Sequence, residues 1–242
     1  RNGITDFELA HYYQYTGYPL GCHMGMKSSG NQHFGLSSPV GGIIEEGVPC
    51  STGISYWGSN IYRAGWVVRD ENGLPDTAKG YVENFASPYF YACTKWFEQM
   101  KIGTKGKVFR DLIDELLPFK DFGVFLNPGH LTHYDEWVSS PIYKDSEIEI
   151  KSGMYLQVDI IPRSPHYSSS RMEDGIIIAD DDLQNALKKE YPDTYNRCMA
   201  RREFMIDTLG INLPKEVLPL SNIPAIVPPY FLNYRKILSL KP

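Results

Sequence analysis

The four cysteines are the first side chains that could do chemistry, and their spacing points to none. Cys22, Cys50, Cys93 and Cys198 lie far apart in the chain. Zinc ribbons and dithiol redox sites need paired cysteines, usually as C-x-x-C, and no such pair occurs. Isolated cysteines are typical of a reducing compartment. We therefore predict a cytoplasmic protein in which each thiol packs as a small buried hydrophobe.

Other common functional signatures are also missing. The sequence has no G-x-S-x-G nucleophile elbow, no phosphate-binding P-loop and no G-x-G-x-x-G dinucleotide motif. Its formal net charge is −5, which disfavours a nucleic-acid partner because such proteins usually carry a basic face. No run of about 18 apolar residues occurs, so no membrane span is expected.

Five short segments, several of them with histidines or acids, stand out together. They are residues 3–9 (GITDFEL), 58–63 (GSNIYR), 128–136 (PGHLTHYDE), 152–159 (SGMYLQVD) and 171–178 (RMEDGIII). In the same order, they resemble the motifs G-x-T-E-x-E-L, G-Y-x-S-D-I-T-R, G-H-G-x-G followed by H-E, P-G-M-x-x-x-x-E-P, and R-x-E-D-x-x-x-V. These are motifs of one known family, that of aminopeptidase P, prolidase, methionine aminopeptidase and creatinase.

This resemblance implies both a fold and a chemistry. Family members share the pita-bread fold, an α+β architecture of two related halves around a curved antiparallel sheet. Most hydrolyse peptides at the N-terminus with two divalent ions, which are held by two Asp, one His and two Glu and activate a bridging water. Creatinase keeps the fold and hydrolyses without metal, so the fold alone does not determine the chemistry.

Three residues match the family's metal ligands. His130 stands at the position of the His ligand, Asp159 at that of one Glu and Glu173 at that of the other. His130 and Glu173 are therefore also the main candidate catalytic residues. Asp159 is one methylene shorter than Glu, so its carboxylate would reach about 1.5 Å less far into the site.

The two Asp ligands have no counterpart in the sequence. The second position carries Asn60, and the first is expected near residues 49–51, yet the stretch from Gly47 to Arg69 contains neither Asp nor Glu. With only two carboxylates left, two dications would leave about two positive charges in a poorly solvated cleft, which is costly. A single Mn, Zn or Co ion on the three matching residues is electrostatically reasonable, and so is no metal at all.

Other family positions match less closely. His133 is the imidazole nearest to the second His of the G-H motif and is a further candidate catalytic residue. The candidate substrate-binding residues are His33, which could match a substrate-gating His, together with Asn60 and Trp57.

These observations leave three functions open. The first is a degenerate family member that binds a peptide or small amide-like ligand, or that serves as an interaction domain, which the missing Asp pair favours. The second is a working hydrolase with one metal, like an Xaa-Pro peptidase, or with none, like creatinase; the retention of His130 and Glu173 favours it. The third is a two-metal aminopeptidase whose ligands are misaligned here. The resemblance also allows a homodimer.

The elements that must position these residues alternate between helices and strands. A capping box at residues 5–8 predicts a helix through about residue 15, and apolar spacing predicts another over 77–100, interrupted at Pro88. Further helices are predicted at 105–117, 182–191 and 193–209, and strands or bends at 41–44, 53–57, 64–68, 148–150, 155–161 and 175–179.

The mixed order of elements indicates the α+β class. We expect one pita-bread domain over residues 1–242, in which residues 211–242 form a docked, mostly irregular tail. Because the sequence begins at Arg1, we also expect it to be the C-terminal part of a longer chain.

Overall fold

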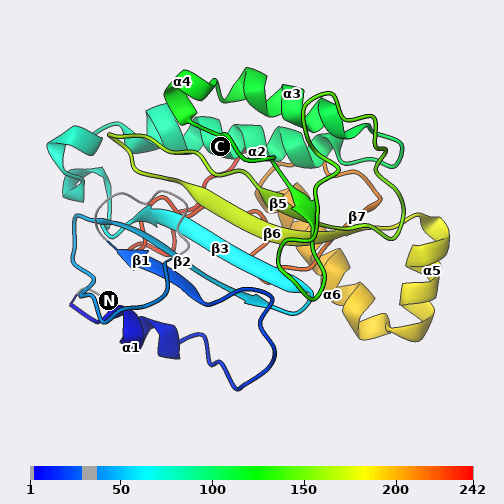
Figure 1. Cartoon of the computed structure of the whole chain (residues 1–242), viewed down its shortest axis with the longest axis horizontal. Helices are drawn as coiled ribbons and strands as arrows, with labels where there is room; N and C mark the ends of the chain where they lie inside the picture. Colours follow the sequence, from blue (N-terminus) through cyan, green and yellow to red (C-terminus); the bar gives the residue numbers. More distant parts are fainter. Residues whose placement is uncertain (1–2, 29–36, 242) are drawn as a thin grey trace.

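The computed structural model describes residues 3–28 and 37–241, in which seven strands form one sheet (Figure 1). The strands are β1 (Gly25–Ser28), β2 (Pro49–Tyr56), β3 (Ser59–Trp66), β4 (His130–Leu131), β5 (Tyr155–Asp159), β6 (Arg171–Ile178) and β7 (Val217–Pro219). The α-helices are α1 (Asp6–His11), α2 (Ser87–Gln99), α3 (Gly106–Leu116), α4 (Phe119–Phe122), α5 (Asp181–Glu190) and α6 (Pro192–Glu203). Short 3₁₀ turns (Glu71–Gly73, Asp76–Ala78) and π-helical turns (Val82–Ala86, Phe204–Thr208) complete the regular structure.

The sheet is antiparallel throughout the described residues. Its strand order is β1-β2-β3-β6-β5-β4, and β7 pairs with the end of β6 that β3 does not reach. Strands distant in sequence are therefore neighbours, since β3 pairs with β6 across more than a hundred residues. One antiparallel sheet with helices packed against it confirms the predicted α+β class.

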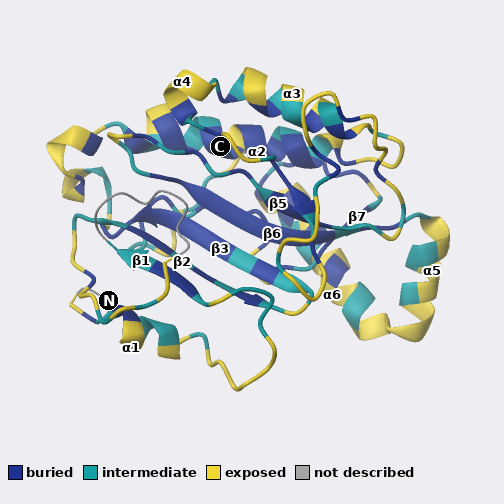
Figure 2. Ribbon diagram, viewed as in Figure 1, coloured by how far each residue is buried: buried dark blue, intermediate teal, exposed yellow. Residues whose placement is uncertain are grey.

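Helices α2 and α3 cover one face of the sheet and build the main core with it (Figures 1 and 2). Phe85, Tyr89 and Trp96 recur at helical spacing and are almost wholly buried. The Tyr89 hydroxyl accepts a hydrogen bond of 2.8 Å from the backbone N–H of Met172, which ties α2 directly to β6.

Residues of β6 alternate between the two faces of the sheet, as in any strand. Met172 and Asp174 face the helices, whereas Arg171 and Glu173 face the other side. Asp174 accepts two hydrogen bonds from the guanidinium of Arg63, at 2.8 and 2.9 Å, and both side chains are about 95% buried. A buried ion pair therefore fastens β3 to β6 on the face that carries no candidate site residue.

The helix predictions were right in kind and less accurate in their ends. The capping box at Thr5 and Glu8 is confirmed, but α1 ends at His11, and Gln14 has a positive φ of 53°. Pro88 lies in the first turn of α2, after a π-helical turn, so the predicted interruption is confirmed. No helix in the described part of the chain is long and apolar enough to cross a membrane.

Two of the predicted strands or bends are not strands. Residues 41–44 and 148–150 each make a single bridge, Thr5 with Ile43 and Lys105 with Glu149, instead of a ladder. Strand β6 begins at Arg171, four residues earlier than predicted, and β5 ends at Asp159. The tail is mostly irregular, as predicted, except for β7.

The buried ion pair yields a stability prediction. Asp174→Ala should lower the free energy of unfolding by about 3–5 kcal/mol, because Arg63 would stay buried without its carboxylate. Urea unfolding at neutral pH measures the change. The double variant Arg63→Met/Asp174→Leu should recover much of the loss, and a single variant as stable as wild type would contradict the assigned role of the pair.

Candidate functional site

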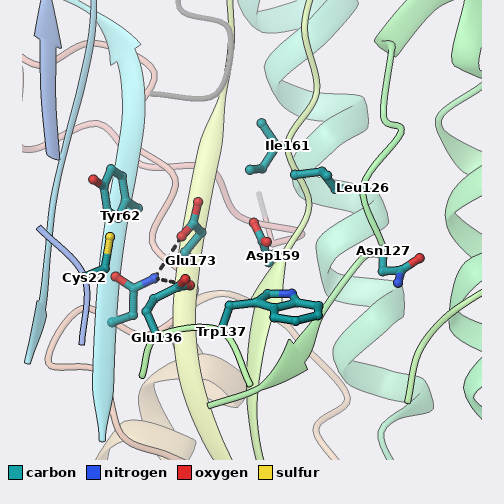
Figure 3. A pocket seen from close by; sticks show the side chains of 10 residues that line it. Cys22, Tyr62, Leu126, Asn127, Glu136, Trp137, Asp159, Ile161 and Glu173 are labelled. Carbon is teal, nitrogen blue, oxygen red and sulfur yellow. Dashed lines mark hydrogen bonds between the residues drawn. The ribbon is translucent and has the colours of Figure 1, made fainter. Parts of the chain in front are cut away.

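A cavity of about 330 Å³ lies on the side of the sheet that Glu173 faces (Figure 3). Acids and an amide form one part of its wall, and apolar side chains form the rest. The lining residues are Cys22, Asn60, Tyr62, Leu126, Asn127, Glu136, Trp137, Asp159, Ile161 and Glu173.

Three neighbouring strands position the polar wall. The register pairs Tyr62 of β3 with Glu173 of β6, and Glu173 with Asp159 of β5. Directly opposite residues share a face and have Cβ atoms about 5 Å apart. Asn60 stands two residues before Tyr62 and therefore points the same way. The alternation of the strands thus brings Asn60, Asp159 and Glu173 together.

The Asn60 amide links two carboxylates that come from different parts of the chain. Its Nδ2 donates to Glu173 Oε2 at 3.0 Å and to Glu136 Oε1 at 3.1 Å (Figure 3). Asn60 is 1% exposed, and its Oδ1 is buried without a hydrogen-bond partner among the described residues. One neutral side chain therefore holds two acids at the cavity wall.

His130 is buried beside the same acids. Its Nε2 lies 3.1 Å from Glu136 Oε1 and 3.7 Å from Asp159 Oδ2. Burial lowers the pKa of this imidazole, but the close contact with Glu136 and the charge of Asp159 together outweigh it and raise the pKa to about 9. His130 is therefore a cation at neutral pH.

Asp159 and Glu173 form a buried carboxyl pair. Burial is the main cause that raises the pKa of both groups, and the charge of Asp159 adds to it at Glu173, whose pKa reaches about 8. Arg171 acts in the opposite direction, with its Nε 3.4 Å from Glu173 Oε1. Glu173 therefore keeps its proton at neutral pH.

The Tyr62 ring packs beside Arg171. The Arg171 guanidinium lies 5.8 Å from the centre of the Tyr62 ring, in a cation–π arrangement. The ring has room because β2 carries glycine there: a Cβ on Gly53 would lie only 2.3 Å from Tyr62 ring atoms.

The cluster balances its own charge. We call Glu136, Asp159 and Glu173 the carboxylate cluster. With Glu173 protonated, its other two members carry two negative charges, and His130 and Arg171 supply two positive ones. Such internal balance lowers the cost of burying ionised groups.

The structure brings some of the predicted site residues together and separates others. His130, Asn60, Asp159 and Glu173 converge as described. Trp57 lies on the exposed tip of the β2–β3 hairpin, where its ring centre is 4.9 Å from that of Tyr134. The His133 ring centre is 4.2 Å from the same Tyr134 ring. Neither Trp57 nor His133 lines the cavity. His33 lies outside the described residues.

Glu136 is the site residue that sequence reasoning missed. It ends the segment 128–136 that resembles the G-H motif, but it was not counted as a site carboxylate, so the count of two carboxylates was too low. Its loop is held in place by a backbone hydrogen bond of 3.1 Å from Glu136 N to Gly21 O. The only signal was its place in the H-E motif, because a loop residue has no periodicity that predicts its direction.

Three solved structures that are similar to this chain carry peptidase names. The X-Pro aminopeptidase from Thermotoga maritima matches 74% of this chain and 52% of its own, with a TM-score of 0.60 and 17% identity. The Xaa-Pro dipeptidase from Bacillus anthracis (TM-score 0.58, 16% identity) matches 76% and 52%, and the prolidase from Pyrococcus furiosus (0.58, 19%) matches 74% and 54%.

The chain has the pita-bread fold. The identities are too low to show more than that, and the chain spans about half the length of these proteins. No protein-family sequence model matches the chain, and neither does any curated protein sequence. The fold that the sequence motifs implied is nevertheless confirmed.

Within this pita-bread sheet, the residue opposite Asn60 is Ser55. The predicted position for the first Asp ligand, residues 49–51, pairs with residues 64–66 at the other end of the β2–β3 ladder. The hairpin turns at Trp57–Gly58, so residues 49–51 lie at the end of the ladder that is farther from Asn60.

Neutral side chains occupy the β2–β3 pair nearest the hairpin end of the cleft. Ser55 and Asn60 are opposite each other there, and Asn60 turns its N–H groups, not its oxygen, toward Glu136 and Glu173. Among the described residues, no group of three His, Cys, Asp or Glu side chains is arranged to hold a metal ion.

The shifted pKa values predict how stability varies with pH. His130 has a folded pKa of about 9 against an ordinary 6.5, so its contribution is complete below pH 6.5 and is lost as pH rises through 9. Folded Glu173 keeps until about pH 8 a proton that the unfolded chain loses near 4.5. Both groups therefore make the free energy of unfolding fall between pH 6 and pH 9.

Glu173→Gln should make this fall shallower, because the amide mimics the protonated carboxyl and does not titrate. Chemical unfolding at several pH values measures the slope. Glu147→Gln is the matched control, since that exposed carboxyl has a pKa of about 2 and titrates below this range. An unchanged slope in Glu173→Gln would refute the assignment of the raised pKa.

Proposed function

We propose that this pita-bread cleft binds a peptide or a small amide-like ligand and does so without a two-metal centre. The observation that carries the proposal is the Asn60 amide, which links Glu136 and Glu173 through its two N–H groups. An Asp at this position would present oxygens to a cation, whereas Asn60 presents hydrogen-bond donors to acids.

Charge supports the same proposal. Two dications and Arg171 would bring five positive charges to a carboxylate cluster that supplies at most three negative ones, with His130 neutral if it served as a ligand. The excess of two charges would be poorly solvated, because Arg171 is wholly buried and Glu173 is 5% exposed. At most one ion is therefore expected.

The unpaired polar atoms of the cavity indicate what a ligand should offer. Asp159 Oδ1 and Asn60 Oδ1 are buried acceptors without a hydrogen-bond partner among the described residues. A ligand that donates N–H groups would satisfy them, and peptide amides and terminal amines do so. Leu126, Ile161 and Trp137 give the cavity an apolar wall for the rest of the ligand.

The similar solved structures suggest which probes to use. They are named as X-Pro aminopeptidase, Xaa-Pro dipeptidase and prolidase, so a free dipeptide such as Ala-Pro is the first probe. Because this chain covers only about half of each of those proteins, their activity remains part of the proposal here.

Metal content and peptide binding test the proposal together. After incubation with Mn, Zn or Co and removal of free ions, elemental analysis should find no more than one ion per chain. Calorimetry should detect Ala-Pro or a related free dipeptide in EDTA. Asp159→Asn should weaken that binding by roughly tenfold or more, because an N–H group loses its charged acceptor.

Val138→Ala is the matched control, since Val138 follows Trp137 in the same loop, is 49% exposed and does not line the cavity. Two bound ions per chain would contradict the metal part of the proposal. Failure of a panel of free dipeptides and small amides to bind would contradict the ligand part.

A second candidate is hydrolysis of a C–N bond without a two-metal centre. The observation that favours it is His130, an imidazole that stays protonated to about pH 9 between two carboxylates and could deliver a proton to a leaving nitrogen. Turnover of Ala-Pro or creatine in EDTA, abolished in His130→Gln, would select this function over binding alone.

A further inference from the structure

Two neutral side chains face each other across the β2–β3 hairpin beside the carboxylate cluster. Ser55 and Asn60 are directly opposite in the ladder, and each is 1% exposed. Both therefore point to the side of the sheet that Glu173 faces. The Ser55 hydroxyl donates to the backbone oxygen of Ser59 at 3.3 Å, whereas Asn60 Oδ1 has no hydrogen-bond partner in residues 3–28 and 37–241.

The charge of the side chains at positions 55 and 60 decides whether the cleft can hold two divalent cations. Acids at 55 and 60 would raise the carboxylate count from three to five. Five negative charges would balance two dications and Arg171. Without the ions, the same five acids would outnumber His130 and Arg171 in a buried place, which is unfavourable.

We infer that Ser55 and Asn60 are the residues that keep a pair of divalent cations out of this cleft, and that carboxylates at these two positions would complete a donor set for them together with the carboxylate cluster and His130. The inference rests on the proposed function in one respect only, that the wild-type cleft holds no two-ion centre.

The row of the sheet that holds Asp159, Glu173 and Tyr62 crosses β2 at Gly53, so Ser55 lies on the Asn60 side of this row and Ser51 on the opposite side. Ser51 faces the same side of the sheet and is equally buried, but it pairs with Ala64. It lies four residues from Ser55, which corresponds to about 13 Å along a strand. An acid at Ser51 would add the same charge outside the reach of a cation beside Asn60.

Gain of metal binding tests the inference. Ser55→Asp/Asn60→Asp should bind about two Mn²⁺ per chain by equilibrium dialysis and by loss of the free Mn²⁺ electron paramagnetic signal. Its affinity should exceed that of wild type at least roughly tenfold. Its thermal midpoint should fall in EDTA and recover in Mn²⁺, because the ions bind the folded state.

Ser51→Asp/Asn60→Asp is the matched control, since it has the same charge and residue types at the wrong position. It should not gain a second ion. If the test variant fails to fold even with Mn²⁺, the single variant Asn60→Asp tests the inference. It should gain one ion and a thermal midpoint that rises with Mn²⁺. Ser59→Asp points to the other face of the sheet and should show neither effect.

Two outcomes would overturn the inference alone: no Mn²⁺ gain in either Asn60→Asp or the Ser55 double variant, or an equal gain in the Ser51 double variant. Wild-type protein that already binds two Mn²⁺ would overturn the proposed function as well. The metal content of the wild type therefore distinguishes the two failures.

Discussion

The two-residue alternation of an antiparallel sheet is the constraint on which this molecule depends. Because neighbouring residues of β6 face opposite sides, Glu173 enters the cavity wall while Asp174 pairs with Arg63 beneath the helices. Strand β6 thus contributes one acid to the cavity wall and another to the ion pair that ties β6 to β3. A shift of register by one residue would exchange the two acids, leaving one without its guanidinium and the other away from the Asn60 amide.

Because the side chains on the cavity side of the sheet are buried, each charged group there needs a hydrogen-bond partner or an opposite charge. The carboxylate cluster lies where strands of the sheet and the loops that carry Leu126 and Trp137 exclude most water, so each acid needs a donor or a cation close by. Asn60, His130 and Arg171 supply these within the chain itself. The consequence is a raised pKa at Glu173 and at His130, since each proton that stays bound reduces the net buried charge.

Sequence reasoning recovered what local patterns encode. Motif order gave the pita-bread fold, and apolar spacing gave α2 and α3. Motif positions singled out His130, Asp159 and Glu173, which the structure places on adjoining strands. It failed where geometry depends on contacts distant in sequence. Glu136 lies in a loop whose direction is set by a hydrogen bond to Gly21, and the partner of Asn60 depends on where the hairpin turns.

The hairpin also explains how a fold and its chemistry can separate. The β2–β3 ladder is held by backbone hydrogen bonds, which are indifferent to whether position 55 carries a hydroxyl or a carboxylate. The net charge of the cleft does depend on this choice, since it differs by one unit between a neutral side chain and a carboxylate. The same backbone sheet is therefore compatible with different side chains in the cleft. The solved peptidases share the fold with this chain, but the fold alone does not determine what the cleft holds.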